Sequence, residues 1–275
     1  MNATATPVRR PGRSPRREVT QARVILSEWT KLRSLRSTIV SLLFAVGVIL
    51  GLSALIPLVV VSHWPPPEPG AAASFDPTAR ALGGAFLAQI AIGVLGVLLI
   101  TGEYATGMIR ASFAAVPSRL PVLWAKALVY GAVTLTLTVP TTFVAFLIGQ
   151  NILSRQHIEA HPGDPGVLRA IVGTALYLTV VGLLGLAIGA LLRNTAGAIS
   201  TLFCILFVVP IIVRFLPSSW ADPINRYLPN TVGETITRTR IDPTGLAPWP
   251  AFALFCAYTA LVLAAAAIAL RRRDT

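Results

Sequence analysis

Few residues in this sequence have the type and spacing that metal or redox chemistry requires. His157 and His161 are four residues apart, which on a helix would place both imidazoles on one face for a metal ion. Pro162 follows directly, and no cysteine or group of carboxylates is close, so a solvated loop is the favoured interpretation. Cys204 and Cys256 each lie inside an apolar run and share no metal or redox spacing. We therefore expect no metal centre in this chain.

The motifs of ATP hydrolysis and of common hydrolases are absent from the sequence. It contains no G-x-x-x-x-G-K-[ST] phosphate-binding loop, no H-E-x-x-H and no G-x-S-x-G. No apolar run holds the pair of acidic residues that a membrane protease or a proton relay would use. The chain is therefore expected not to be an enzyme by itself and to bind no cofactor.

Glu103 is the acidic residue with the most unusual position. It lies just past the end of an apolar run, where a carboxylate is costly unless it is hydrated or paired. Arg110 and Arg119 follow in the same polar segment and are candidate partners. Helix-forming residues between Gly107 and Pro117 predict a short helix there, although a simple charged loop at the membrane edge is the alternative.

The elements that position these residues are apolar and long. Of the 275 residues, 54% are apolar and 12% are charged, against roughly 45–50% and about 25% in an ordinary soluble domain. Six apolar runs are each long enough to cross a bilayer core of roughly 30 Å. We predict an all-α polytopic membrane protein with six transmembrane helices. The predicted spans are 39–61, 81–100, 122–148, 170–192, 196–215 and 250–270.

The distribution of basic residues predicts the orientation. An even number of spans places both termini on one side, and most of the 23 lysine and arginine residues lie on that side. The positive-inside bias then makes both termini cytoplasmic, in a multi-pass protein of the cell membrane. The Arg-rich tail, residues 1–17, is predicted to be disordered and to contact anionic lipid rather than nucleic acid. Residues 18–275 form one predicted transmembrane domain.

Residues 19–34 predict an amphipathic helix in the inner membrane interface, although a plain solvent-exposed helix is the alternative. Trp29 would lie at headgroup depth, Lys31 on the opposite polar arc, and Arg33 would reach the interface near the helix end. The segment 216–249 is long and partly apolar, which predicts short outer helices before the last span.

Two patterns within the spans have two interpretations each. The third span carries five threonines, which either line a path for an amphipathic molecule or bond to their own helix. They are Thr134, Thr136, Thr138, Thr141 and Thr142. In the fourth span Gly185 and Gly189 form a G-x-x-x-G pair, which fits either packing within the chain or a dimer face.

The polar segment after the second span resembles the cytoplasmic loop of type-2 permease subunits of ATP-binding-cassette (ABC) exporters. The matching residues are Glu103-x-x-x-Gly107-Met108-Ile109-Arg110, then Pro117-Ser118-Arg119, and Lys126 at the foot of the next span. The opening Glu28-Trp29-Thr30-Lys31-Leu32-Arg33-Ser34 resembles their N-terminal interfacial helix. The likeness extends over nearly the whole chain from about residue 20.

This resemblance implies a mechanism and a set of partners. Two permease copies, identical or different, would pair around a central path, and each would dock on a separate ABC ATPase subunit that binds ATP and magnesium. A coupling helix in the loop would transmit ATP-driven closure of the ATPases. The coupling residues carried over are Glu103, Gly107, Ile109, Arg110, Pro117 and Arg119. Many relatives have Thr and Glu where this chain has Met108 and Arg110, so the matching ion pair with the ATPase differs here.

The expected function is therefore ATP-driven export of an amphipathic or lipid-like molecule, such as a drug, lipid, peptide or natural product. Spans almost free of ionisable residues favour such a substrate over a small ion. Substrate identity and the direction of transport stay open at this stage. The alternative is a membrane protein without an ATPase, such as a scaffold or an envelope-stress sensor. A lipid-modifying enzyme fits less well, because no set of reactive residues converges near one interface.

Overall fold

The computed structural model describes residues 20–66, 75–108, 120–240 and 245–272, and every regular element in these ranges is a helix. Six helical segments in this part of the chain are long and apolar enough to cross a membrane. They are α2 (Arg36–Ser62), α4 (Ala85–Ala105), α6 with the 3-10 turn η1 (Leu120–Gln156), α7 (Val167–Leu192), the segment α8 to α9 (Thr195–Arg214) and α12 (Pro248–Arg272). The all-α fold is thus confirmed, and the six predicted apolar segments form helices long enough to span a membrane, with shifted boundaries.

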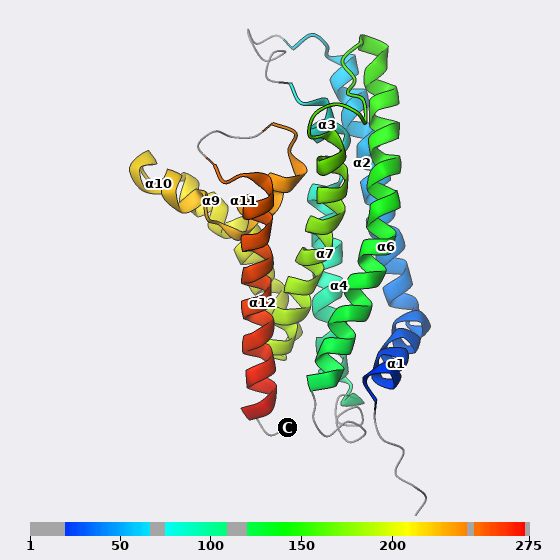
Figure 1. The fold of residues 1–275 in the computed structure, drawn as a ribbon, viewed down its shortest axis with the longest axis vertical. Helices are drawn as coiled ribbons and strands as arrows, with labels where there is room; N and C mark the ends of the chain where they lie inside the picture. Colours follow the sequence, from blue (N-terminus) through cyan, green and yellow to red (C-terminus); the bar gives the residue numbers. More distant parts are fainter. Residues whose placement is uncertain (1–19, 67–74, 109–119, 241–244, 273–275) are drawn as a thin grey trace, which may run out of the picture.

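Helix α7 forms the centre of the bundle and packs against α4, α6 and α12 (Figure 1). Of its most apolar stretch, 78% is buried, against 22% for α2. Its contact with α4 is a close approach of two backbones: a Cβ at Gly96 would overlap the carbonyl oxygen of Gly182, and one at Gly185 that of Gly93. Gly189 faces Val97 and Ile100 of α4 in the same way. The G-x-x-x-G pair therefore serves packing within the chain.

Helix α4 begins and ends later than the predicted span 81–100. The short helix α3 (Pro77–Ala81) occupies the start of that range, and a turn separates it from α4. The side chain of Asp76 accepts hydrogen bonds from the first backbone amides of α3, which fixes its start. At the other end, Glu103 lies inside the last turn of α4 rather than beyond the helix.

Helix α6 (Leu120–Leu153) is the longest helix in the described ranges, and it continues into η1 (Ser154–Gln156). Its threonine hydroxyls bond mostly to its own backbone. Thr136, Thr138, Thr141 and Thr142 donate to carbonyl oxygens three or four residues earlier, at 2.7–3.1 Å. This geometry confirms the self-bonding interpretation for these four side chains.

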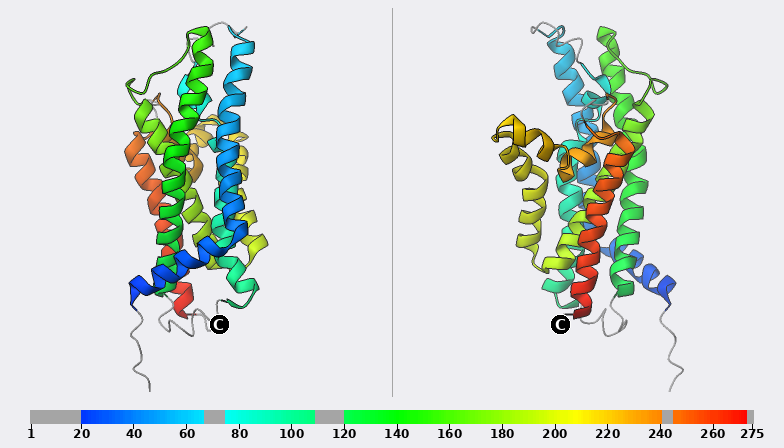
Figure 2. Two further views of the ribbon diagram at one scale, coloured as in Figure 1. Left: turned by 90° about the vertical axis from the view of Figure 1, so that its right-hand side faces the viewer. Right: turned by 60° about the vertical axis from the view of Figure 1, so that its left-hand side comes forward.

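Helix α1 (Gln21–Ser34) lies across the base of α2 and α6 (Figure 2). Leu35 has an extended backbone and separates α1 from α2. The predicted helix is present, and most of its polar arc is exposed, including Arg23 and Thr30. Glu28 lies on the buried face of α1 with Val24 and Leu32, and the side chain of Lys31 is only 26% exposed. Both meet oppositely charged residues of α4 or α6.

The fifth span contains an irregular turn. It consists of α8 (Thr195–Phe203), a π-helical turn η2 (Cys204–Val208) and α9 (Val209–Arg214). Pro210 lies just after this turn; because proline has no N–H and its ring crowds the carbonyl four residues earlier, a regular helix cannot continue unchanged there. A short turn joins α7 to α8, as the sequence predicts.

The segment between the fifth and sixth spans contains the predicted short helices. They are α10 (Ser218–Asn225), α11 (Pro229–Glu234) and the 3-10 turn η3 (Thr235–Thr237). Helix α11 and η3 pack on α12 and α7, whereas α9 and α10 stand away from the other spans (Figures 1 and 2).

Candidate functional site

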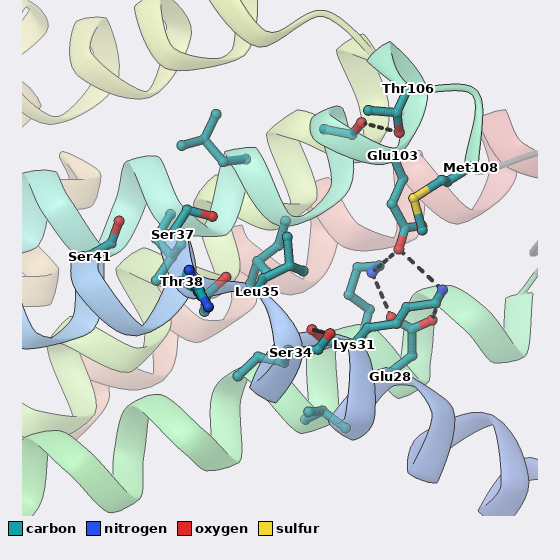
Figure 3. A pocket seen from close by; sticks show the side chains of 18 residues that line it. Glu28, Lys31, Ser34, Leu35, Ser37, Thr38, Ser41, Glu103, Thr106 and Met108 are labelled. Carbon is teal, nitrogen blue, oxygen red and sulfur yellow. Dashed lines mark hydrogen bonds and ion pairs between the residues drawn. The ribbon is translucent and has the colours of Figure 1, made fainter.

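Four charged side chains meet where α1, the last turn of α4 and the second turn of α6 come together. Lys31 Nζ lies 2.7 Å from Glu28 Oε1 and 3.2 Å from Glu103 Oε1. Lys126 Nζ lies 2.6 Å from Glu28 Oε2 and 2.9 Å from Glu103 Oε1. Each lysine thus bridges both carboxylates (Figure 3). We call these four residues the charge junction.

The positions of the four residues along their helices explain the convergence. Glu28 and Lys31 are three residues apart on α1 and therefore share one face. Glu103 lies two residues before the end of α4, and Lys126 lies six residues after the start of α6. Because α4 and α6 flank residues 106–119, both helices bring their charged residue to the same end of the bundle as α1.

The junction is buried and its formal charges balance. Residue exposures are 4% for Glu28, 9% for Glu103 and 6% for Lys126. Burial alone lowers the pKa of Lys31, but its hydrogen bonds and charge interactions with Glu28 and Glu103 outweigh this, so the pKa lies above its ordinary value of 10.5. Burying an ion costs roughly several kcal/mol in desolvation, and a close opposite charge offsets this cost. The four residues therefore depend on one another, since removal of any one leaves a buried charge with fewer partners.

A cavity of about 670 Å³ opens beside the junction, between the bend from α1 to α2 and the end of α4. One wall is apolar and consists of leucine and valine side chains of α4 and α6. The other wall is polar and includes Ser34, Arg36, Ser37, Thr38 and Ser41, as well as the junction itself. Figure 3 shows Ser37, Thr38 and Ser41 along the start of α2, and Ser34 at the end of α1, closer to the junction residues.

The structure brings two of the predicted site residues together, Lys31 and Glu103. Gly107 has a left-handed backbone with φ of 73° directly after α4, a conformation that favours glycine and ends the helix. Trp29 and Arg33 lie on the exposed side of α1 and do not contribute to the junction. Four predicted coupling residues lie outside the described residues: Ile109, Arg110, Pro117 and Arg119.

The structure gives Glu103 two partners that the sequence did not predict. Its carboxylate pairs with Lys31 and Lys126, whereas the candidate partners Arg110 and Arg119 lie outside the described residues. The sequence prediction considered only neighbours along the chain, whereas Lys31 is 72 residues away. It also missed Glu28 as a site residue. One signal in the sequence could have identified the junction. Glu103 and Lys126 lie next to or inside apolar segments and therefore require partners of opposite charge, and residues 21–34 contain both a Lys and a Glu that can serve.

A second polar site lies among α4, α7, α11 and η3. The hydroxyl of Tyr177 donates to Gln89 Oε1 at 2.5 Å. Both residues line a cavity of about 170 Å³ that also contains Glu234 and Arg238. Burial raises the pKa of Glu234, and the nearby Arg238 and Arg214 offset this only in part. The site is polar but small.

Within the described ranges, no group of three or more His, Cys, Asp or Glu side chains lies close enough to hold a metal ion. The possible pair of His157 and His161 is thus not part of a larger cluster among these residues. Comparison of the chain with models of known protein families and with curated proteins gave no match. The case for a function therefore depends on the residues and their geometry.

Proposed function

We propose that this chain is the permease subunit of an ABC transporter and exports an amphipathic or lipid-like molecule. Both termini and the charge junction would face the cytoplasm, and the six spans would lie in the cell membrane. ATP and magnesium would bind a separate ABC ATPase subunit. This proposal follows the resemblance of residues 28–34 and 103–126 to type-2 permeases and the topology predicted from the charge distribution.

The observation that carries the proposal is the position of the charge junction. It joins α1, α4 and α6 through four ion pairs of 2.6–3.2 Å. Helices α4 and α6 are also the two spans that flank the segment proposed to contact the ATPase. A force on that segment would move both spans together with α1, since separating any of the three helices would expose a buried charge without its partner.

The composition of the spans supports transport that depends on an external energy source. Within the described spans, ionisable side chains are concentrated at helix ends, so a buried proton or sodium relay has few residues to use. An energy source outside the membrane, such as an ATPase, would replace ion coupling. The apolar side chains of the spans suit a substrate with a large apolar part.

A second permease copy is part of this proposal. The fifth span has only 28% of its most apolar stretch buried, and beyond its end at Arg214 the chain continues with exposed apolar residues. Phe215 is 84% exposed, and Trp220 of α10 is 66% exposed. In the proposed assembly a neighbouring permease would cover this surface, whereas the equally exposed faces of α2 and α12 would contact lipid.

Co-purification tests the proposal. The full chain, tagged at the C-terminus and extracted in mild detergent from its native membrane, should retain an ATP-hydrolysing subunit. Arg110→Glu should release that subunit, whereas Arg272→Glu, which reverses a charge in the last turn of α12, should not. Absence of any ATPase under gentle extraction would contradict the proposal and favour a scaffold or sensor.

A further inference from the structure

The cavity beside the charge junction has two chemically different walls, and these define the kind of molecule it can hold. Leu95, Leu98, Leu99 and Val129 form its apolar wall. Leu98 of this wall is 41% exposed, and Leu35 in the bend between α1 and α2 is 47% exposed, so apolar side chains continue from the cavity onto the surface of the bundle. A molecule in this cavity can therefore keep its apolar part in the membrane while its polar part reaches the opposite wall.

The polar wall carries a net charge of one positive unit, counted over the junction residues and Arg36. The four junction charges cancel, and Arg36 adds a guanidinium that forms no ion pair with any described side chain. Ser37, Thr38 and Ser41 lie on the first two turns of α2 and line the same cavity. A guanidinium beside hydroxyl groups is a typical partner for a phosphate group.

Glu103 provides an independent observation. Its Oε1 accepts from both lysines, but its Oε2 is buried and accepts no hydrogen bond from the residues that the structure describes. The residue is only 9% exposed, and it lines the cavity. A buried carboxylate oxygen without a donor is costly, so a ligand that brings an N–H or O–H group to it would gain binding energy.

We propose that this cavity binds one glycerophospholipid whose headgroup combines a phosphate with a hydrogen-bond donor. Arg36 holds the phosphate, Glu103 Oε2 accepts from the headgroup amine or hydroxyl, and the acyl chains lie along the leucines of α4. Ethanolamine and glycerol headgroups share this chemistry. A choline headgroup has the phosphate but no N–H or O–H, and it should bind more weakly. The site does not depend on an ATPase or on a transported substrate.

The test measures lipid binding to the purified full chain without any partner. Delipidated protein in detergent is titrated separately with dioleoyl phosphatidylethanolamine, phosphatidylglycerol and phosphatidylcholine, and bound lipid is counted by native mass spectrometry. We expect one tightly held lipid per chain with the first two and about tenfold weaker binding of the third, the effect of one charge-assisted hydrogen bond. The tighter of the first two lipids identifies the preferred headgroup. Equal binding of all three would overturn the proposal.

Two variants and a control locate the site. Arg36→Ala should weaken the tightly held lipid about tenfold, since it removes the phosphate contact. Leu98→Trp should weaken it by filling the apolar wall and leaves every charge in place. Arg272→Ala removes one exposed charge at the same end of the bundle and should bind as the unmodified chain does. If both cavity variants fold, as judged by gel filtration, and bind lipid normally, the proposal is wrong.

Discussion

Two regions of the bundle hold the same helix, α4, by opposite means. Near its middle, Gly93 and Gly96 allow its backbone to touch that of α7, and no charged group takes part. At its end, Glu103 joins α1 and α6 through a buried network of charges. The first contact depends on the absence of side chains, and the second depends on the presence of four of them.

The two regions differ in how readily their arrangement can change. A backbone contact without side chains has one close-packed arrangement, and any added atom disturbs it. A network in which each lysine contacts two carboxylates responds to charge, to protonation and to movement of a neighbouring helix. We infer that the α4–α7 contact is the fixed part of the fold and that the charge junction is the part that can transmit a signal.

The largest expected effect is that of Lys126→Met. This change leaves Glu28 and Glu103 buried with one lysine between them, and the loss of one partner from a buried ion pair costs roughly 3–5 kcal/mol. Thermal unfolding in detergent should show a large loss of stability. The double variant Lys126→Met with Glu28→Gln restores the charge balance and should recover part of it. If the loss of stability in the double variant equals the sum of the losses in the two single variants, the residues do not act as a network.

A smaller effect is expected at the backbone contact. Gly96→Ala places a methyl group against the carbonyl oxygen of Gly182, and overpacking of this kind costs about 1–3 kcal/mol. Gly51→Ala is the matched control, because a Cβ there meets no atom within 4 Å. Thermal unfolding should separate the two variants. Equal stability would show that α4 and α7 are less closely packed than described.

The smallest effect is a dependence on pH that should distinguish the two regions. Because the pKa of Lys31 is raised on folding, its contribution to stability is fully present below its ordinary pKa of 10.5 and is lost as the pH rises through the folded value. Unfolding curves measured from neutral to strongly alkaline pH should show this loss. Lys31→Met should reduce it, whereas Gly96→Ala should leave it unchanged. An identical alkaline profile for Lys31→Met would contradict the assignment.

Long apolar runs were sufficient to predict six membrane-spanning segments, because a length of apolar sequence and a bilayer thickness are directly comparable. The short helices after the fifth span were also predictable from their mixed composition. The end of α4 was not, since the helix continues through Glu103, whose charge is compensated by Lys31 and Lys126. Neutralisation by distant residues leaves no local signal in the sequence.

The charge junction was predictable only in part. Glu103 and Lys31 stand out as site residues, but their partnership does not, because it depends on how α1 lies across α6. The amphipathic pattern of α1 predicted that its polar arc faces away from the bundle, and most of that arc is exposed. Glu28 lies instead on the buried face with Val24 and Leu32, where it meets Lys126. The period of the apolar residues gives no signal for a carboxylate that is paired inside the bundle.

The most direct test of the account is the ATPase activity of the co-purified complex with Glu103→Ala in the permease. If the charge junction couples the spans to the ATPase, the variant complex should keep its ATPase subunit and insert normally but lose the permease-dependent stimulation of ATP hydrolysis. Thr106→Ala, which removes an exposed hydroxyl that donates to the carbonyl oxygen of Gly102, should retain the stimulation. Full stimulation in the Glu103→Ala complex would contradict the central claim that this junction transmits the signal.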